Sequence, residues 1–379
     1  MNLTIPRADL ADMTAQVARA LPNKPSVPVL AGIKLGFDGS TLTAEAYDYE
    51  TSTRVQAAAN GEPGTVLVSG RLLAEITKSL PNKPVTMTTT GAHLELVCGS
   101  ARFTLPTMPV EDYPTLPTLP TPVGEVDAAV FGQAIAQAVT SAGRDEALPM
   151  MTGVRIELRP DHIAFLSTDR YRLTERITDW KPSRPDIEAD ALVPARTLAD
   201  LAKTLTAGTL TVALTADRPG EGLIGFDTSS RQITSRLLDG GNYPPVRTLF
   251  PKPEEVTTRV TVDRGVLIEV VKRVALVAER TTPVLLTFNP DGCVVEAGGS
   301  EEARASETLP DNTVTCDGGP VTIGFNPQYL IDGLAAITGQ RAHLAMVGAY
   351  KPAVITTAGE DGQPVDGHRY LIMPIRVSR

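Results

Sequence analysis

Residues that commonly carry catalysis or bind metals are few in this chain, and they lack the spacing that such sites need. Among 379 residues there are four histidines, His93, His162, His343 and His368. None belongs to an HExxH pattern, in which two histidines one helical turn apart bind zinc. The chain also contains no Gly-rich phosphate-binding loop of the Walker type and no GxSxG turn for a nucleophilic serine. We therefore predict no enzymatic activity, no cofactor and no metal site.

The cysteines and the apolar runs indicate where in the cell the protein works, and they do not indicate a catalytic or metal-binding role. Cys98, Cys293 and Cys316 are odd in number and lack the paired spacing of a metal site, so we interpret them as reduced structural thiols. No apolar run approaches the roughly 18 residues of a membrane-spanning helix, and the first ten residues lack the hydrophobic stretch of a signal peptide. We therefore predict a cytoplasmic protein without a membrane partner.

Positive charge is the remaining candidate for function. The net charge of −9 argues against a protein whose whole surface binds nucleic acid, but it is compatible with a local basic face. Basic residues collect on or beside the segments with helical periodicity, and if they shared one side they would contact phosphates without reading sequence. On charge alone, ordinary solvated helix faces are the simpler explanation. The residues are Arg19, Lys24, Arg71, Lys78, Lys83, Arg144, Arg196, Lys203, Lys272, Arg273 and Arg280.

The helices that would position these side chains recur in three copies. In each copy an apolar helical run leads to a proline followed by a hydrophobic strand start, at Pro28, Pro149 and Pro283. A second helix follows, as GRLLAEI (70–76), ARTLADL (195–201) and PQYLIDG (327–333). The repeat distance of about 125 residues exceeds the roughly 20 to 50 residues of solenoid repeats, so each copy is long enough to bury its own core. We therefore predict three tandem domains.

Within each copy the strand pattern dominates. Segments such as 33–37 and 154–158 alternate apolar and polar residues, which is typical of strands with one wet face. Helical spacing is clear in Leu198, Leu201, Ala202 and Leu205, which fall at i, i+3, i+4 and i+7. The pattern predicts α+β domains with two helices laid on one side of antiparallel sheet.

Two proline-rich stretches separate the copies. Prolines recur through 106–124 too often for a helix, and a second break follows at 250–255. Both segments are predicted to be linkers whose prolines restrict motion between the domains. The predicted domains are residues 1–122, 123–254 and 255–379.

Six segments, in order along the whole chain, are similar to the bacterial replicative sliding clamp, the beta subunit of DNA polymerase III. The Met-Pro-Ile-Arg near the C-terminal end and the Thr-Asp-x-x-Arg-Leu pattern are the most specific. The segments are PSVPVLAGIKL (25–35), MPVEDYPTLP (108–117), STDRYRL (167–173), RLLDGGNYPPVRTLFP (236–251), KRVALVAERTTPV (272–284) and YLIMPIR (370–376).

The resemblance implies a DNA polymerase processivity factor. Three tandem homologous clamp domains, each with two helices packed on antiparallel sheets, would form half of a closed ring, and two chains would join head to tail as a homodimer. Twelve helices about 10 Å apart enclose a hole roughly 28 Å wide, enough for a duplex about 20 Å wide. DNA would be held topologically and without sequence specificity. The DNA-facing residues would be Lys24, Arg71, Lys78, Arg144, Arg196, Lys203 and Lys272.

A head-to-tail ring needs two different surfaces on each chain. Such contacts form a closed ring only when the rotation from one chain to the next returns to the first chain. The resemblance assigns Ala275 and Leu276 of the third domain to one surface, and Phe103 and Leu105 of the first domain to the other. The latter two lie in a strand whose edge would pair across the interface. Core packing within each domain is an equally good explanation for any one of these four residues.

The resemblance also implies a hydrophobic pocket between the second and third domains that binds short peptides. Its users would be a replicative polymerase subunit, a clamp-loader ATPase that supplies the nucleotide chemistry for ring opening, and other proteins with a clamp-binding motif. Apolar, aromatic, Met and Arg residues suit such a site. The predicted wall is Met151, Thr168, Arg170, Tyr171, Arg172, Leu173, Pro244, Thr248, Leu249, Asn326, Tyr329, Pro352, Leu371, Met373, Pro374, Ile375 and Arg376.

Two departures from the family pattern fall in this wall. Many relatives have a second Met where this chain has Ile375, and the Pro244-Pro245 pair is unexpected. Adjacent prolines restrict their own φ and the preceding residue, so the pocket rim should be reshaped or stiffened. This suggests a clamp with a retuned pocket, such as a second copy that tolerates a small molecule blocking the usual site.

Two other classes of protein remain as alternatives. A hydrolase or transferase built on three β-rich domains would need a convergent acid, base or nucleophile set, which the sequence does not show. A structural or ligand-binding repeat protein that never meets DNA would share the repeats but would not stay on circular DNA.

Overall fold

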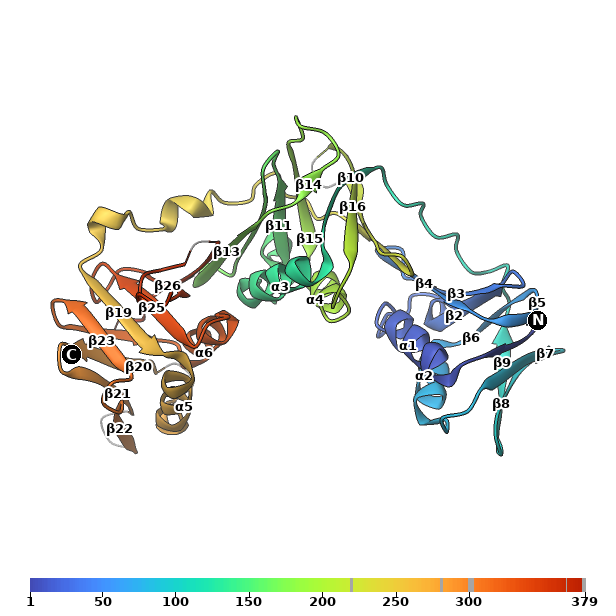
Figure 1. The fold of residues 1–379 in the computed structure, drawn as a ribbon, viewed down its shortest axis with the longest axis horizontal. Coiled ribbons are helices and arrows are strands. Elements are labelled where there is room, and N and C mark those ends of the chain that lie inside the picture. Colours follow the sequence, from blue (N-terminus) through green and yellow to red (C-terminus); the bar gives the residue numbers. More distant parts are fainter. Residues whose placement is uncertain (219–220, 280–281, 299–302, 366, 377–379) are drawn as a thin grey trace. The chain divides into compact units, whose positions relative to one another are not determined.

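The computed structural model describes residues 1–218, 221–279, 282–298, 303–365 and 367–376 (Figure 1). Two compact units are present, and each is described by itself. Unit 1 comprises Met1–Gly132, Trp180–Ile187 and Thr197–Leu238, and unit 2 comprises Gln133–Asp179, Glu188–Arg196 and Asp239–Arg379. Among the described residues, no helix is long and apolar enough to cross a lipid bilayer.

Two α-helices occur in each of the three sequence copies, as the periodicity predicts. One boundary differs: α4 ends at Ala202, so that Leu205 lies beyond it although it is buried. The backbone N–H and the hydroxyl of Thr204 both donate to the Leu201 carbonyl, at 2.9 and 2.6 Å, and this tight turn ends the helix. The α-helices are α1 Arg7–Ala18, α2 Gly70–Ser79, α3 Ala128–Ala138, α4 Ala195–Ala202, α5 Arg264–Val274 and α6 Pro327–Ala336. The 3₁₀ turns are η1 Pro28–Ala31, η2 Val139–Ser141, η3 Pro149–Thr152, η4 Val246–Leu249, η5 Pro253–Glu255 and η6 Ala275–Val277.

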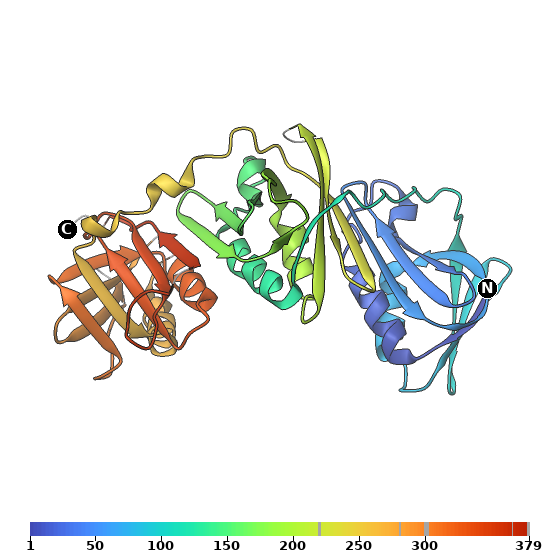
Figure 2. The same cartoon turned by 45° about the horizontal axis from the view of Figure 1, so that its top comes forward.

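The strands of unit 1 form one antiparallel sheet in the order β14-β10-β16-β17-β18-β4-β3-β2-β6-β9-β8-β7-β1-β5. Its helices α1 and α2 pack against each other and lie side by side in Figures 1 and 2. The strands are β1 Asn2–Ile5, β2 Gly32–Phe37, β3 Thr41–Tyr47, β4 Thr51–Ala58, β5 Asn60–Glu62, β6 Gly64–Ser69, β7 Val85–Thr90, β8 His93–Cys98, β9 Ala101–Met108, β10 Pro122–Asp127, β14 Lys181–Pro182, β16 Thr209–Arg218, β17 Glu221–Asp227 and β18 Arg231–Arg236.

Unit 2 contains two antiparallel sheets. Their strand orders are β15-β11-β12-β13-β27-β26-β25-β19-β23 and β22-β21-β20-β24. The strands are β11 Gly153–Leu158, β12 Ile163–Thr168, β13 Arg172–Thr178, β15 Ala189–Pro194, β19 Thr258–Asp263, β20 Val284–Asn289, β21 Gly292–Gly298, β22 Arg304–Thr308, β23 Val314–Gly318, β24 Val321–Phe325, β25 Arg341–Met346, β26 Ala353–Thr357 and β27 His368–Ile372.

The core of unit 2 contains a helix pair packed on antiparallel sheets, as the sequence predicts. In unit 2, one apolar cluster joins Val260 of β19 and Leu344 of β25 to Leu286 of β20 in the other sheet. Val271 of α5 and Leu330 of α6 belong to the same cluster. The two helices therefore bury their apolar faces against two sheets, because one sheet face does not cover the wide apolar stripe of a helix pair.

The prolines that begin each copy have two different roles. Pro28 and Pro149 each open a 3₁₀ turn, and the strand starts only after that turn, at Gly32 and Gly153. Pro283 directly precedes β20, as the sequence pattern predicts for all three. A proline fixes its own φ near −65°, a value that suits the first position of a helical turn.

Strand pairing joins neighbouring copies of the repeat. In unit 1, β4 pairs with β18, so that Thr51 lies opposite Ser235. In unit 2, β13 pairs with β27, so that Leu173 lies opposite Leu371. Backbone hydrogen bonds therefore hold each of these joints directly.

The first predicted linker is shorter than 106–124. Strand β9 continues to Met108 and β10 begins at Pro122. Pro106 is tolerated inside β9 because only one edge of the strand is paired there, opposite His93 of β8. The second predicted linker contains the short η5 turn within an otherwise irregular stretch.

Candidate functional site

The turn between β12 and β13 carries the centre of the predicted pocket. Asp169 Oδ1 accepts hydrogen bonds from the backbone N–H groups of Tyr171 and Arg172, both at 3.0 Å. Thr168 Oγ1 donates to the Arg172 carbonyl at 2.8 Å and accepts from the Arg170 N–H at 3.1 Å. These bonds hold Arg170 at a φ of +79°, a conformation that non-glycine residues seldom adopt. As a result Tyr171 projects outward and is 53% exposed.

Arg172 fixes helix α6 beside this turn. Its guanidinium contacts Asp169 at 2.8 Å and Asp332 of α6 at 2.6 Å, and it lies 4.3 Å from the centre of the Tyr329 ring. The side chain is only 8% exposed. A buried guanidinium with two carboxylates and an aromatic face is fully occupied, so Arg172 positions the pocket wall rather than offering free donors.

A cavity of about 610 Å³ opens beside this turn and α6, a size typical of ligand sites. Five residues of the predicted wall line it: Met151, Arg170, Tyr171, Arg172 and Tyr329. The rings of Tyr171 and Tyr329 lie 6.3 Å apart. Several other lining residues were not predicted, although Asp169, Gln328 and Asp332 lie within the segments STDRYRL and PQYLIDG. These are Ala142, Gly143, Asp145, Leu148, Asp169, Gln328 and Asp332, together with Arg144, which was predicted to face DNA.

A second group of predicted residues lies at the paired strands β13 and β27. Leu173 and Leu371 lie opposite each other and are each 1% exposed, so they are buried in the sheet and do not line the cavity of about 610 Å³. Beyond β27 the Met373 backbone N–H donates to the Tyr171 carbonyl at 2.8 Å, which brings Met373 next to the turn. Met373 is 38% exposed and available for contact. The Ile375 N–H donates to the Gly324 carbonyl at 2.8 Å and ties the end of the chain to β24.

Asn326 caps a helix. Its side-chain oxygen accepts from the backbone N–H groups of Gln328 and Tyr329, at 2.9 and 3.2 Å, at the start of α6. Its contribution to the pocket is therefore to position Tyr329. No hydrogen bond or ion pair is found for Pro352 or Pro374, which are half-buried, or for the exposed Arg376 among the described residues.

The segment with the proline pair forms the η4 turn. The Val246 N–H donates to the Pro244 carbonyl at 2.8 Å, and the hydroxyl of Thr248 donates to the Pro245 carbonyl at 2.8 Å. Both proline carbonyls are thus used to build the turn. Leu249 at its end remains 52% exposed. None of these residues lines the cavity of about 610 Å³, so the stiff rim stays a prediction.

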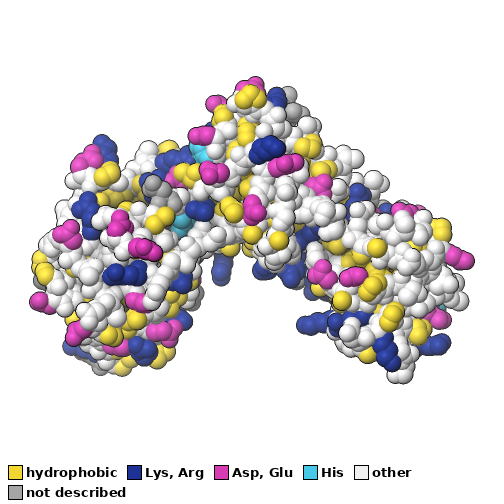
Figure 3. Space-filling view, viewed as in Figure 1, with side chains coloured by type: hydrophobic (Ala, Val, Ile, Leu, Met, Phe, Trp, Pro, Cys, Tyr) yellow, Lys and Arg dark blue, Asp and Glu magenta, His cyan; other side chains and the backbone are white. Residues whose placement is uncertain are grey.

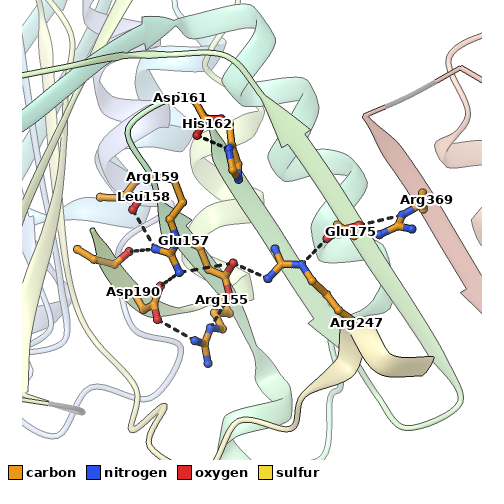
Figure 4. A network of polar contacts seen from close by, with 11 residues as sticks. Arg155, Glu157, Leu158, Arg159, Asp161, His162, Glu175, Asp190, Arg247 and Arg369 are labelled. Carbon is orange, nitrogen blue, oxygen red and sulfur yellow. Dashed lines mark hydrogen bonds and ion pairs between the residues drawn. The ribbon is translucent and has the colours of Figure 1, made fainter. Parts of the chain in front are cut away.

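A network of charged residues attaches η4 to the sheet, and it was not predicted (Figure 4). Arg247 contacts Glu157 at 2.7 Å and Glu175 at 2.6 Å. Arg369 of β27 donates to the second oxygen of Glu175 at 2.8 Å, and its guanidinium lies 4.1 Å from the centre of the Phe250 ring. The sequence does not reveal it, because Arg247 and Arg369 lie 72 and 194 residues from Glu175.

We expect Glu175→Gln to destabilise unit 2 by about 2 kcal/mol at neutral pH. This is less than the roughly 3–5 kcal/mol of a fully buried pair, because the Arg247 and Arg369 side chains are each 44% exposed. Burial raises the pKa of Glu175, but hydrogen bonds and charge from Arg369 and Arg247 outweigh it and lower the pKa below the usual 4.5.

The pH dependence of this loss has a definite sign. Because folding lowers the pKa of Glu175, its ionised carboxylate stabilises the fold fully at pH values above the unfolded-state pKa of 4.5. This stabilisation is lost as the pH falls through the pKa of the folded state. Denaturant unfolding measures this for the unmodified protein and for Glu175→Gln. The difference between their free energies of unfolding should be smaller below pH 4 than at pH 7. An equal difference at both pH values would contradict the role given to Glu175.

Comparison with known proteins now identifies the family. Profiles of the DNA polymerase III beta subunit match along nearly the whole chain: the N-terminal domain at residues 1–117, the central domain at 125–245 and the C-terminal domain at 247–376. The chain belongs to the bacterial DNA polymerase III beta subunit family, the sliding clamps. Its fold is α+β with three clamp domains, and members of this family are processivity factors rather than enzymes.

Individual relatives agree with the family profiles. The beta sliding clamp of Streptomyces coelicolor is 46% identical, and the beta sliding clamp homolog GriR of Streptomyces muensis is 38% identical; each alignment covers 100% of both chains. The crystal structure of the Pseudomonas aeruginosa sliding clamp bound to griselimycin superposes with a TM-score of 0.88 at 25% identity over 100% of both chains.

The predicted DNA-facing residues of this clamp are all exposed, but two of them are already paired. Lys203 contacts Asp200 at 2.8 Å and Lys272 contacts Glu269 at 2.9 Å. Within the described part of the chain, no ion pair involves Lys24, Lys78 or Arg196. Figure 3 shows Lys and Arg side chains in dark blue near the places where Figure 1 draws α1 and α2. Of the basic residues beside the helices, Arg280 lies outside the described residues.

The four predicted interface residues of this clamp differ in accessibility. Leu276 in η6 is 84% exposed, the highest value among the exposed large apolar side chains. Ala275 and Phe103 are partly buried and pack against the cores of their own units. Leu105 is 1% exposed and belongs to the core of unit 1, so it could support an interface only through its strand.

Proposed function

We propose that this clamp forms a head-to-tail homodimeric ring that encircles duplex DNA and tethers DNA polymerases and other partners. The three domains would be residues 1–122, 123–254 and 255–379. We further propose that the ring works in the cytoplasm with a separate clamp-loader ATPase. The observation that carries the proposal is a pair of strand edges, one on β9 and one on β22, that have no partner strand within the described residues.

Strand β9 pairs with β8 along residues 101–106, whereas β6 reaches only Thr107 and Met108. Its other edge is therefore free within the described residues. Strand β22 is the last strand of its sheet and pairs only with β21 there. Free edges invite pairing with another chain. Joining β9 of one chain to β22 of the next would bury both edges, and Leu276 near α5 supplies apolar surface for such an interface.

Retention on circular DNA tests the proposal. Clamps loaded onto a nicked circle by a clamp loader should remain bound through gel filtration in high salt, because topology rather than charge holds them. Cutting the circle should release them within minutes. Retention that does not depend on circularity would contradict encirclement.

Charge reversal tests the DNA-facing surface. Lys24→Glu, Lys78→Glu and Arg196→Glu together should reduce the salt dependence of DNA binding by a slope of about 0.9 per lost phosphate contact. The matched control reverses Lys203 and Lys272, whose charges are already neutralised by neighbouring carboxylates, and should change the slope less. Equal slopes for the two variants would count against a surface centred on the unpaired residues.

For the partner site we propose a hydrophobic peptide pocket with a retuned rim. Tyr171, Tyr329 and Met373 would receive the peptide, and η4 with Leu249 would form the rim. The Pro244-Pro245 pair and Ile375 motivate the idea of a variant copy, and the similarity to the homolog GriR is compatible with it. Identity to the ordinary Streptomyces coelicolor clamp is nevertheless higher.

A labelled clamp-binding peptide distinguishes a retuned pocket from an ordinary one. Griselimycin should displace the peptide from an ordinary clamp at lower concentration than from this chain. Equal displacement from both proteins would remove the idea of a variant copy, while peptide binding itself would still support the pocket.

A further inference from the structure

A second cavity of unit 2 lies beside residues 250–256, on the face of the sheet opposite the apolar core that contains Val260 and Leu344. Its volume is about 450 Å³, within the range of small-molecule sites. Phe250 and Val256 line it from the linker, and Val354 lines it from β26. Ile177 and Val365 contribute apolar side chains that are 36% and 48% exposed. None of the residues predicted for the peptide pocket lines this cavity.

The floor of the cavity contains a buried hydroxyl without a partner. Thr356 of β26 is 6% exposed, and its Oγ1 makes no hydrogen bond within the described residues. Its cross-strand neighbour His343 is 5% exposed and lines the same cavity. Burial, together with the charge of Arg259, lowers the pKa of His343 and keeps it neutral at neutral pH. A buried polar atom is normally paired, so the floor lacks an acceptor that a ligand can supply.

The charges on the wall favour an anion. Glu175 is the carboxylate among the described lining residues, and both of its oxygens are occupied by Arg247 and Arg369. Arg259 also lines the cavity, and the only hydrogen bond of its side chain in the described part of the protein is a long one, 3.4 Å, to the Pro253 carbonyl. Because Arg369 is paired with Glu175, Arg259 is the lining guanidinium without a carboxylate partner in the described chain, and it leaves the wall with net positive charge.

We propose that this cavity binds a small apolar molecule that carries one carboxylate. The carboxylate accepts a hydrogen bond from the Thr356 hydroxyl and is attracted by Arg259, while the apolar part packs against Val354 and Val365. Such a site is separate from the peptide pocket. It adjoins that pocket through Phe250, which directly follows Leu249 of the rim. The proposal does not depend on ring formation.

Fluorescence titration with 8-anilinonaphthalene-1-sulfonate tests this site, because the probe combines apolar rings with one anionic group. We expect one probe molecule per chain, displaced by octanoate but not by 1-octanol, which has the same chain length without the charge. Ala345→Phe places a ring in the cavity and should abolish binding. Thr356→Val keeps the side-chain shape and should weaken octanoate about tenfold, as should Arg259→Gln.

Thr322→Val is the matched control for the hydroxyl, because Thr322 lies on β24 outside the cavity and pairs with Thr287 at 3.0 Å. It should leave octanoate binding unchanged. Each variant is checked for an unaltered melting temperature and for peptide binding, which reports on the neighbouring pocket. Displacement by 1-octanol as strong as by octanoate, full probe binding to folded Ala345→Phe, or no probe binding to the unmodified protein would each overturn the proposal.

Discussion

Leu276→Asp should convert the proposed dimer to monomers while leaving the chain folded. Leu276 is 84% exposed, so it contributes little to the stability of its own domain. If it is buried in the interface, each copy contributes about 2 kcal/mol of apolar burial, and a ring contains two copies. Their loss, with two buried charges added, should weaken dimerisation by at least about 1,000-fold. Sedimentation equilibrium over a range of concentrations measures this change directly.

The control for this substitution is Val27→Asp, which places the same charge at another exposed apolar position, 44% exposed, in unit 1. No predicted interface includes Val27, so this variant should remain dimeric. Val27→Asp should keep the melting temperature of the parent, and Leu276→Asp should still unfold in one cooperative transition, which shows that the chain remains folded. A Leu276→Asp protein that sediments as a dimer would exclude this residue from the interface, and retention on circular DNA should then also be unaffected.

Tyr171→Ala and Met373→Ala together should weaken binding of a clamp-binding peptide by about 100-fold or more. Both side chains are exposed in the free chain, at 53% and 38%, and a backbone hydrogen bond holds them next to each other. Aromatic and flexible apolar anchors commonly contribute about 1–2 kcal/mol each to peptide recognition, and two such losses multiply in affinity. Fluorescence anisotropy with a labelled peptide measures the loss.

Tyr49→Ala is the control for removing an exposed aromatic side chain. Tyr49 is 47% exposed, lies in unit 1 and is not among the residues predicted for the pocket. It should leave the peptide affinity unchanged. Because the targeted side chains are exposed, the double variant should unfold at the parent temperature, which separates loss of recognition from loss of structure. Undiminished affinity in the double variant would remove Tyr171 and Met373 from the site.

Many elements of the fold could be predicted because their signals are local. The strand over 33–37 follows from alternation and corresponds to β2, and the segment 70–76 follows from helical spacing and lies in α2. The C-terminal end of α4 could not be predicted, because a hydrogen bond from the Thr204 side chain ends the helix before Leu205. Likewise the predicted linker was too long, because an unpaired strand edge tolerates a proline that sequence rules assign to irregular structure.

The sequence by itself determined the threefold repetition, the two helices of each copy, the family and the motif residues around Tyr171 and Met373, since each of these is written in short stretches of chain. Only the tertiary structure decided which distant segments meet. Glu175 contacts Arg247 and Arg369, which are 72 and 194 residues away, and the hydroxyl of Thr356 in β26 has no hydrogen-bond partner among the described residues. The physical reason is that strand pairing and burial of charge depend on long-range register. Two segments with ordinary local patterns acquire a specific partner only when the whole sheet has formed.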